Sequence, residues 1–140
     1  MLKTINPLLT GDLLKILADM GHGDELAIVD ANFPAHQMGR RVVELPGSTA
    51  TAALSAILAL FPLDDFVPVP MGVMDAVGQS VPIYDEFRAE GRRHEGREIG
   101  MELIERFAFY DRARAAYAVV ATGERRLYGN VIIKKGVIRA

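Results

Sequence analysis

Short, nearly continuous apolar runs alternate along the chain with longer segments in which apolar residues recur at helical spacing. The segment GDLLKILADMGHG has Asp12 near its start, an apolar face and glycines at its end, a pattern that predicts a helix. Residues 25–30 then form a run that is apolar except at its ends, with β-branched residues at its centre, as a strand buried on both faces requires. His22 therefore lies on the turn between a helix and a strand.

The same alternation continues toward the C-terminus. Residues 41–45 are a short strand candidate, and the Ala- and Leu-rich run TATAALSAILALF is typical of a helix that lies flat on a sheet. FVPVP is extended because each proline restrains the residue before it, and its prolines favour an edge strand or a strand that ends early. The remaining expected elements are a strand near 101–106, a helix near 108–115, and strands at AYAVVAT and NVIIKKGV on either side of a turn at GERR.

Alternating helices and strands define the fold class. They predict an α/β fold of three layers, in which helices cover both faces of a mixed, mostly parallel sheet. No repeat or linker interrupts the 140 residues, so we expect a single domain over residues 1–140.

The segment PIYDEFRAEGRRHEGRE, residues 82–98, differs from the rest in its dense charges of both signs. With Pro82 at its first turn, it predicts an exposed helix followed by a loop, with His94 on the solvated face. Neither His94 nor His36 belongs to a motif, so we expect both at the surface.

Composition narrows the classes of function. Half of the residues are hydrophobic and the formal net charge is −2, a balance that gives no indication of disorder, nucleic-acid binding or an anionic membrane surface. The absence of cysteine excludes disulfides and thiolate chemistry. No stretch suits a secretion signal or approaches the ~20 apolar residues of a membrane span, so we expect a cytoplasmic protein with small-molecule partners.

His22 and Asp30 are the first candidate site residues. Gly21 and Gly23 leave the imidazole without side-chain neighbours, and the strand that follows ends in a lone carboxylate that we expect within reach of the same ligand. Histidine suits proton transfer because its unperturbed pKa of about 6.5 leaves both protonation states available near neutrality. Two alternatives stay open: His22 as a cap at the helix C-terminus, and Asp30 as a cap of the next turn.

Three separated segments carry a resemblance to a known family. LLKILADMGHGDELAIVDANFPAH, RFAFYDRARAAYAVVATGE and YGNVIIKKGV resemble, in order and spacing, the signatures of the RbsD/FucU family of sugar mutarotases. The resemblance implies an RbsD-like fold and a ring-shaped homo-oligomer, commonly a decamer, whose active sites lie between neighbouring subunits and need no cofactor. It also implies interconversion of the anomers of free monosaccharides, L-fucose in one branch, and of pyranose and furanose forms of D-ribose in the other.

The resemblance also assigns roles to residues. His22 matches the catalytic acid of the family, and Asp30 matches its sugar-binding carboxylate. Four residues match further substrate-binding positions: Arg106, Tyr128, Gly129 and Asn130. The fucose branch is the more similar one, because Arg106 stands where the ribose branch commonly has histidine. Asn32 departs from the fucose pattern, which often has a histidine after the DA dipeptide.

Anomer exchange requires little beyond positioned acid–base groups. One proton must reach the ring oxygen and another must leave the anomeric hydroxyl, after which the ring opens, the aldehyde turns and the ring closes. Positioned acid–base groups contribute about 10²–10⁴-fold to such a step. Arg106 offers a fork of donors, Tyr128 a ring and a hydroxyl, and Asn130 both a donor and an acceptor for sugar hydroxyls. Together with these groups, the resemblance implies an isomerase acting on L-fucose, with D-ribose as the alternative substrate.

Two other classes of function stay open. His22, Asp24, Asp30 and His36 are two histidines and two acids within fifteen residues, but their spacing is not that of a metal motif, so we expect no metal. The second is a non-catalytic monosaccharide-binding accessory protein of sugar uptake. Such a protein would need the sugar-binding residues but would not require His22 as an acid.

One apolar segment, FPLDDFVPVPMGVM, exceeds what an edge strand alone needs to bury. It either supplies a surface to a partner subunit or forms ordinary core. The apolar side chains concerned are Phe61, Phe66, Val69, Met71 and Met74.

Overall fold

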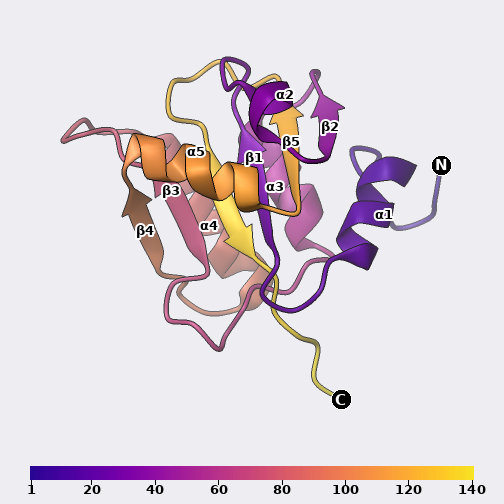
Figure 1. Cartoon of the computed structure of the whole chain (residues 1–140). Coiled ribbons are helices and arrows are strands. Elements are labelled where there is room, and N and C mark those ends of the chain that lie inside the picture. The colour runs from indigo at the N-terminus through magenta and orange to yellow at the C-terminus, as the bar shows by residue number, and fades with distance from the viewer.

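The chain forms five helices and six strands in the computed structural model, which describes residues 1–140 (Figure 1). The helices are α1 (Gly11–Asp19), α2 (Ala35–Met38), α3 (Ala50–Leu58), α4 (Ile83–Glu95) and α5 (Arg106–Ala115). The strands are β1 (Glu25–Val29), β2 (Val42–Leu45), β3 (Met71–Met74), β4 (Met101–Ile104), β5 (Ala118–Thr122) and β6 (Val131–Lys134). None of the helices combines the length and apolar content that crossing a bilayer requires.

The six strands form one sheet in the order β2-β5-β1-β6-β3-β4. Strand β6 is antiparallel to both of its neighbours, β1 and β3, whereas the other pairings are parallel. Five strands therefore end at one edge of the sheet, the carboxyl edge, and β6 begins there. At the opposite edge, the amino edge, those five strands begin and β6 ends. The expected mixed, mostly parallel sheet is confirmed.

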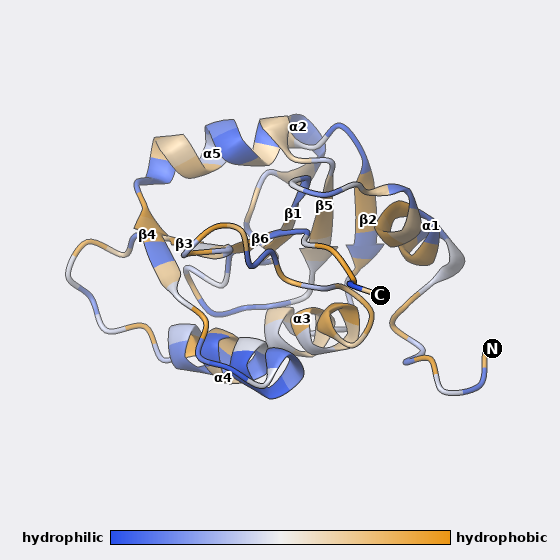
Figure 2. Cartoon of the chain, turned by 90° about the horizontal axis from the view of Figure 1, so that it is seen from below, coloured by the Kyte–Doolittle hydropathy of each residue, from blue (hydrophilic) through white to orange (hydrophobic).

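Helices cover both faces of the sheet, with α2 and α5 over one face and α3 and α4 over the other (Figure 2). Strand β1 serves both layers, because successive side chains of a strand point to opposite faces. Leu26 and Ile28 join the core beneath α3 and α4, and Ala27 and Val29 join the core beneath α2 and α5. All four are fully buried, which is why β1 is a continuous apolar run. The expected three-layer α/β fold is confirmed.

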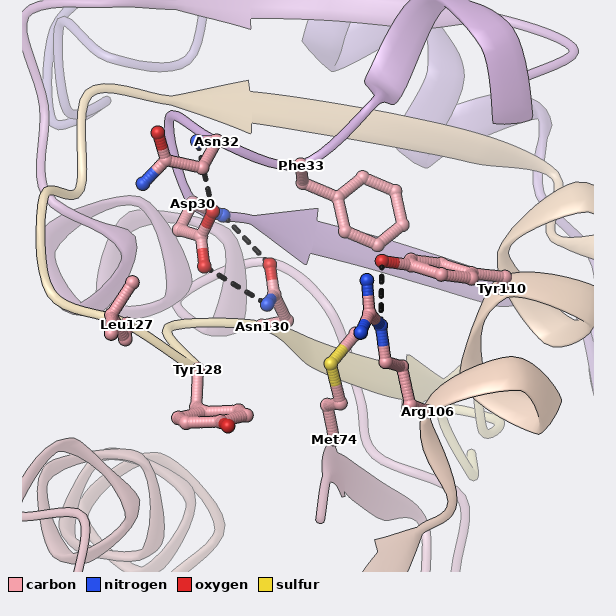
Figure 3. A pocket seen from close by; sticks show the side chains of 9 residues that line it. All are labelled: Asp30, Asn32, Phe33, Met74, Arg106, Tyr110, Leu127, Tyr128 and Asn130. Carbon is pink, nitrogen blue, oxygen red and sulfur yellow. Dashed lines mark hydrogen bonds between the residues drawn. The ribbon is translucent and has the colours of Figure 1, made fainter. Parts of the chain in front are cut away.

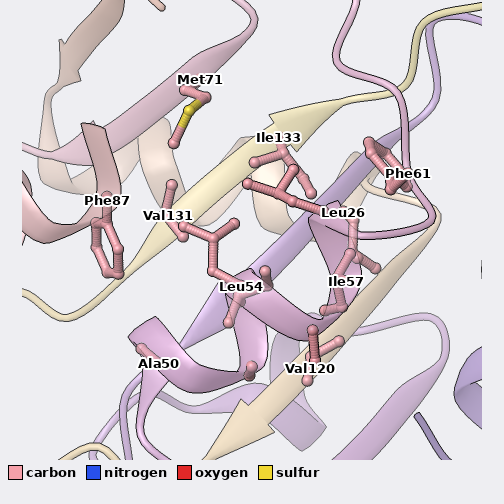
Figure 4. Close-up of a cluster of buried hydrophobic side chains, with 14 of the residues drawn as sticks. Leu26, Ala50, Leu54, Ile57, Phe61, Met71, Phe87, Val120, Val131 and Ile133 are labelled. Atoms are coloured by element: carbon pink, nitrogen blue, oxygen red, sulfur yellow. The ribbon is translucent and has the colours of Figure 1, made fainter. Parts of the chain in front are cut away.

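Two apolar cores hold these layers together. In the larger one, Leu54 of α3 and Phe87 of α4 pack in one cluster with Val131 of β6 (Figure 4). In the smaller one, Phe109 of α5 meets the edge of the Phe33 ring, with 5.9 Å between the ring centroids. The sheet is therefore covered by apolar contacts on both sides, and its polar groups gather at its edges.

The expectation of a strand at FVPVP is wrong. Strand β3 begins at Met71, directly after this segment, and it is not an outer strand of the sheet, because it pairs with β6 on one side and with β4 on the other. Pro68 and Pro70 have no N–H to donate to a ladder. Pro70 contributes only its carbonyl, which accepts a hydrogen bond from the Lys134 amide at 2.9 Å.

Two helices differ from their expected bounds. Helix α5 begins at Arg106 rather than near residue 108, because the Glu105 carboxylate accepts hydrogen bonds from the amides of Phe107 and Ala108 and caps the helix there. The four-residue helix α2 was not expected, since a single turn after Pro34 carries no measurable periodicity.

The charged segment at 82–98 is helical, but only one face of α4 is solvated. Its opposite face is buried in the larger core, through Ile83, Tyr84 and Phe87. His94 is not at the surface as expected: its side chain lies mostly buried against α3, with Nε2 3.4 Å from the Ser55 hydroxyl. Burial lowers the pKa of His94. His36 is exposed, as expected.

The apolar segment that precedes and includes β3 is mostly core. Phe61, Met71 and Met74 are buried, and Val69 is half-buried. Phe66 alone projects its ring into solvent. The interpretation as ordinary core therefore holds for the buried residues, and only Phe66 offers an apolar surface to a partner.

Gly123 provides a test of how the end of β5 is packed. Its amide donates to the Ser48 carbonyl at 2.8 Å, and a Cβ at this position would lie 2.1 Å from the Pro46 carbonyl oxygen. Gly123→Ala should therefore lower the free energy of unfolding by about 1–3 kcal/mol, measured by urea denaturation. Gly47→Ala is the matched control, because a Cβ there meets nothing within 4 Å. Equal stability of the two variants would contradict this packing.

Candidate active site

A polar cavity of about 260 Å³ opens at the carboxyl edge of the sheet (Figure 3). Its walls come from the ends of β1, β3 and β4 and from the start of β6, where ligands of open α/β sheets commonly bind. The volume lies just below the range of drug-sized ligands and suits a small one. The lining residues are Asp30, Asn32, Phe33, Met74, Arg106, Tyr110, Leu127, Tyr128 and Asn130.

Asp30 and Asn130 form the floor of this cavity as a bonded pair. The Asp30 amide donates to Asn130 Oδ1 at 2.9 Å, and Asn130 Nδ2 donates to Asp30 Oδ2 at 3.0 Å. Because a backbone amide can only donate, the first bond fixes which end of the Asn130 amide is oxygen. Both side chains are thereby held in one orientation, although they lie 100 residues apart in the sequence.

Asp30 is only 5% exposed, and its carboxylate has no cation as a hydrogen-bonding partner. Burial raises the pKa of Asp30, and hydrogen bonds from Asn32 and Asn130 partly oppose this rise. Each carboxylate oxygen accepts one hydrogen bond within the chain and has capacity for another. The side chain is thus a fixed acceptor with capacity left for the hydroxyls of a ligand.

The Tyr-Gly-Asn motif forms the side of the cavity that precedes β6. Tyr128 has a φ of 62°, in the left-handed region that a bulky residue rarely adopts. Gly129 is required next to it, because a Cβ there would lie 2.7 Å from the Glu124 side chain. Such local strain is typical of functional sites, where surrounding contacts impose it. Here it sets the Tyr128 side chain against the cavity (Figure 3).

Arg106 reaches the cavity from the first turn of α5. Its Nε donates to the Tyr110 hydroxyl at 3.3 Å, one helical turn further on, and this bond raises the pKa of Arg106. Its terminal N–H groups make no hydrogen bond within the chain. The guanidinium is therefore oriented and charged, with donors available to oxygen atoms of a ligand.

The loop that carries Leu127 and Tyr128 is held by an ion network. Arg126 Nε donates to Glu124 Oε1 at 3.0 Å, and its terminal nitrogens donate to both oxygens of Glu86 on α4, at 2.6 and 3.1 Å. The Arg126 hydrogen bond lowers the pKa of the buried Glu124 to about 2. The sequence shows only a turn at GERR, so this support of the cavity was not predicted.

His22 lies at the other edge of the sheet. It precedes β1, whereas Asp30 follows it, and the strand alone spans about 13 Å at the usual rise per residue. Its ring rests on Phe66, with 4.9 Å between centroids, its Nε2 lies 3.1 Å from Asp64 Oδ1, and its side chain is 44% exposed. Within one chain, His22 and Asp30 therefore do not reach the same ligand, and their action on one ligand stays a prediction.

The four metal-ligand candidates do not come together. Asp24 accepts a hydrogen bond from the Gly21 amide at 2.7 Å, and His36 pairs with Glu44 at 2.8 Å. No three histidine, aspartate or glutamate side chains of residues 1–140 are grouped as metal ligands would be.

Four of the predicted site residues line one cavity: Asp30, Arg106, Tyr128 and Asn130. Gly129, the fifth predicted binding residue, lies between Tyr128 and Asn130 in the chain. Sequence reasoning missed Phe33, Met74, Tyr110 and Leu127. Tyr110 had a usable signal, since it follows Arg106 at the spacing of one helical turn. Phe33 and Met74 had none, because apolar residues at strand ends look like core.

These features define a small α/β protein with a polar ligand site at the carboxyl edge of a mixed sheet. The sequence model of the RbsD / FucU transport protein family matches residues 3–138, and the chain belongs to this family.

Two comparisons place the chain within the family. It is 49% identical to an L-fucose mutarotase of Glaesserella parasuis serovar 5 (strain SH0165), over 98% of this chain and 96% of the relative. It superposes with a TM-score of 0.93 on the fucose mutarotase of Streptococcus pneumoniae solved with L-fucose, at 38% identity, covering 99% of this chain and 100% of the other.

A third comparison bears on the fold alone. RbsD of Bacillus subtilis, solved with D-ribose, is 24% identical and superposes with a TM-score of 0.77, covering 99% of this chain and 100% of that one. The resemblance found in the sequence is thus confirmed at the level of the family and its fold.

The ion network predicts how stability depends on pH. The pKa of Glu124 falls from its ordinary 4.5 to about 2 on folding, so its contribution is fully present above pH 4.5 and is lost as the pH falls toward 2. Between about pH 6 and pH 3, wild type should lose about 2 kcal/mol of stability that Glu124→Gln does not lose. Urea denaturation at each pH measures this difference. Glu98→Gln, at a well-exposed site, is the control and should follow wild type.

Proposed function

We propose that this protein is an L-fucose mutarotase, an isomerase that interconverts the α and β anomers of the free sugar. The observation that carries the proposal is the polar cavity at the carboxyl edge, in a chain whose fold matches a fucose mutarotase solved with L-fucose over 99% of its length. We also propose that it acts in the cytoplasm and requires no cofactor, because ring opening is a proton-transfer reaction.

The cavity provides complementary partners for a monosaccharide. The Asp30 carboxylate accepts hydrogen bonds from hydroxyls, and the Arg106 guanidinium donates to ring or hydroxyl oxygens. Asn130 keeps one N–H and one lone pair beyond its bonds to Asp30, so it can both donate and accept. The Tyr128 ring packs against an apolar face of the sugar, and Gly129 leaves the approach open.

The reaction needs one acid and one base acting on the bound ring. The acid, His22, gives a proton to the ring oxygen as the bond from this oxygen to the anomeric carbon breaks, and the bond's electron pair stays on the oxygen. The anomeric hydroxyl loses its proton to a base, and its electrons form the aldehyde carbonyl. The aldehyde turns about its bond to the next carbon, and the reverse steps close the ring on the other face.

We propose that His22 reaches the sugar from a neighbouring subunit of a homo-oligomeric ring, for which the family suggests a decamer. His22 and the cavity lie at opposite edges of one chain. Exposed apolar side chains accompany both parts: Phe66 next to His22, and Leu127 and Phe107 at the cavity side. Surfaces of this kind suit contact between copies of the chain, since monomers rarely expose them in patches.

The reaction is tested by NMR exchange spectroscopy on L-fucose. Wild type should accelerate exchange between the two anomers, and His22→Gln should lower this rate by about 10²–10⁴-fold while sugar binding is kept. His36→Gln, at an exposed site outside the cavity, is the control and should be fully active. Binding without acceleration by wild type would favour a sugar-binding accessory protein, and faster exchange of D-ribose than of L-fucose would favour the ribose reaction.

Co-expression of two inactive chains tests whether the site is shared between subunits. His22→Gln keeps the cavity, and Asp30→Asn keeps the acid, so a random mixed ring should contain about one complete site in four and recover that share of activity. The double variant mixed with Asp30→Asn is the control, because no arrangement of its chains gives a complete site. Absence of recovery in rings shown by mass spectrometry to be mixed would contradict a shared site.

A further inference from the structure

Asp64 is a buried carboxylate that touches the proposed acid. Its side chain is 3% exposed, and its Oδ1 lies 3.1 Å from Nε2 of His22, 42 residues away in the sequence. The same oxygen accepts a hydrogen bond from the Phe66 amide at 3.0 Å, and the Phe66 ring packs on the imidazole. Burial of a carboxylate is unfavourable unless it is hydrogen-bonded. Here the partners of Asp64 are the imidazole of His22 and the amide of Phe66.

This contact distinguishes the two nitrogens of the imidazole. A carboxylate can only accept, so the hydrogen bond to Asp64 requires the proton of His22 to be on Nε2. The other nitrogen, Nδ1, makes no hydrogen bond within the chain, and the ring is 44% exposed. Nδ1 is thus the nitrogen available to a ligand.

We infer that Asp64 is a positioning residue, which holds His22 in the Nε2–H tautomer and leaves Nδ1 to carry the transferred proton. This inference rests on the proposed function, in which His22 is the acid. The imidazolium holds protons on both nitrogens, and the negative charge of Asp64 stabilises it. Nδ1 gives its proton to the sugar ring oxygen, Nε2 keeps its own, and the neutral imidazole takes a proton back at Nδ1 from the same sugar hydroxyl when the ring closes.

The end of β6 fixes the distance between the two residues. The Gly23 amide, next to His22, donates to the Lys135 carbonyl at 2.8 Å, and the Asp64 amide donates to the Lys134 carbonyl at 3.0 Å. Gly136 allows the close approach, because a Cβ there would lie 2.8 Å from the Asp64 Cα. Both the acid and its partner are therefore anchored to consecutive residues of one strand end.

The adjacent carboxylate, Asp65, belongs to a different contact. It accepts two hydrogen bonds from Arg139, at 2.5 and 3.0 Å, and has no bond to His22. Arg139 lies over the Phe66 ring, with 5.2 Å from its Cζ to the centroid. Asp65→Asn is consequently a matched control, since it removes the same charge one residue away.

The experiment compares anomer exchange of L-fucose by Asp64→Asn and Asp65→Asn in the full-length protein. The oxygen of Asn at position 64 can still accept from the Phe66 amide and from Nε2–H, so the fold should be kept, which thermal denaturation checks, and the variant removes only the negative charge beside the imidazolium. Asp64→Asn should lower kcat by roughly 10- to 100-fold with KM unchanged, because the cavity is not altered. Asp65→Asn should leave both parameters at their wild-type values.

Adding Asp64→Asn to His22→Gln should produce no further loss of kcat, because the carboxylate acts only through the imidazole. A wild-type kcat for Asp64→Asn, a change in KM alone, or a further loss in the His22→Gln background would overturn the inference. Nitrogen-15 NMR of wild type supplies a readout independent of activity: protonated Nε2 supports the inference, and protonated Nδ1 alone overturns it. A fully active His22→Gln would instead refute the acid of the proposed function.

Discussion

The reversed direction of β6 is the constraint on which the rest of the structure depends. This strand pairs with β1 and β3 in antiparallel register, with Ile132 opposite both Ala27 and Gly72. Its start therefore lies at the carboxyl edge, where Asn130 meets Asp30, and its end lies at the amino edge, beside His22. A parallel β6 would have moved Asn130 to the opposite edge and left Asp30 without its amide partner.

The site departs from what stability alone would favour. Asp30 is buried with an amide rather than a cation beside it, and Tyr128 holds a backbone conformation that suits glycine. Such features persist only where the surrounding structure over-determines them. Here the two-sided core fixes the strands, and the network of Glu124, Arg126 and Glu86 fixes the loop between β5 and β6. The polar cavity is thus a local departure that a rigid scaffold stabilises.

Much of this fold follows from local sequence, whereas its pairings do not. The apolar run of β1 and the glycines after α1 predict their elements directly, because burial on two faces and a helix end each leave a local pattern. The edge at which a residue lies is not local. His22 and Asp30 are near neighbours in the chain, yet the strand between them carries them apart. Asp64 gives no signal within an apolar, proline-rich segment, since its partner lies 42 residues away.

Placement at opposite edges suits the opposite requirements of binding and proton transfer. On the proposed mechanism, Asp30 must be a fixed acceptor, and burial with bonds to both oxygens provides this. The acid must instead lose and regain a proton in every turnover, so one of its nitrogens must have no fixed partner, and Nδ1 of the half-exposed His22 has none within the chain. A single buried pocket would surround both groups with fixed hydrogen-bond partners. On the proposed mechanism, delivery of the acid by another copy of the chain lets a buried carboxylate and an imidazole with one unpartnered nitrogen form at different edges of the sheet and meet only at the ligand.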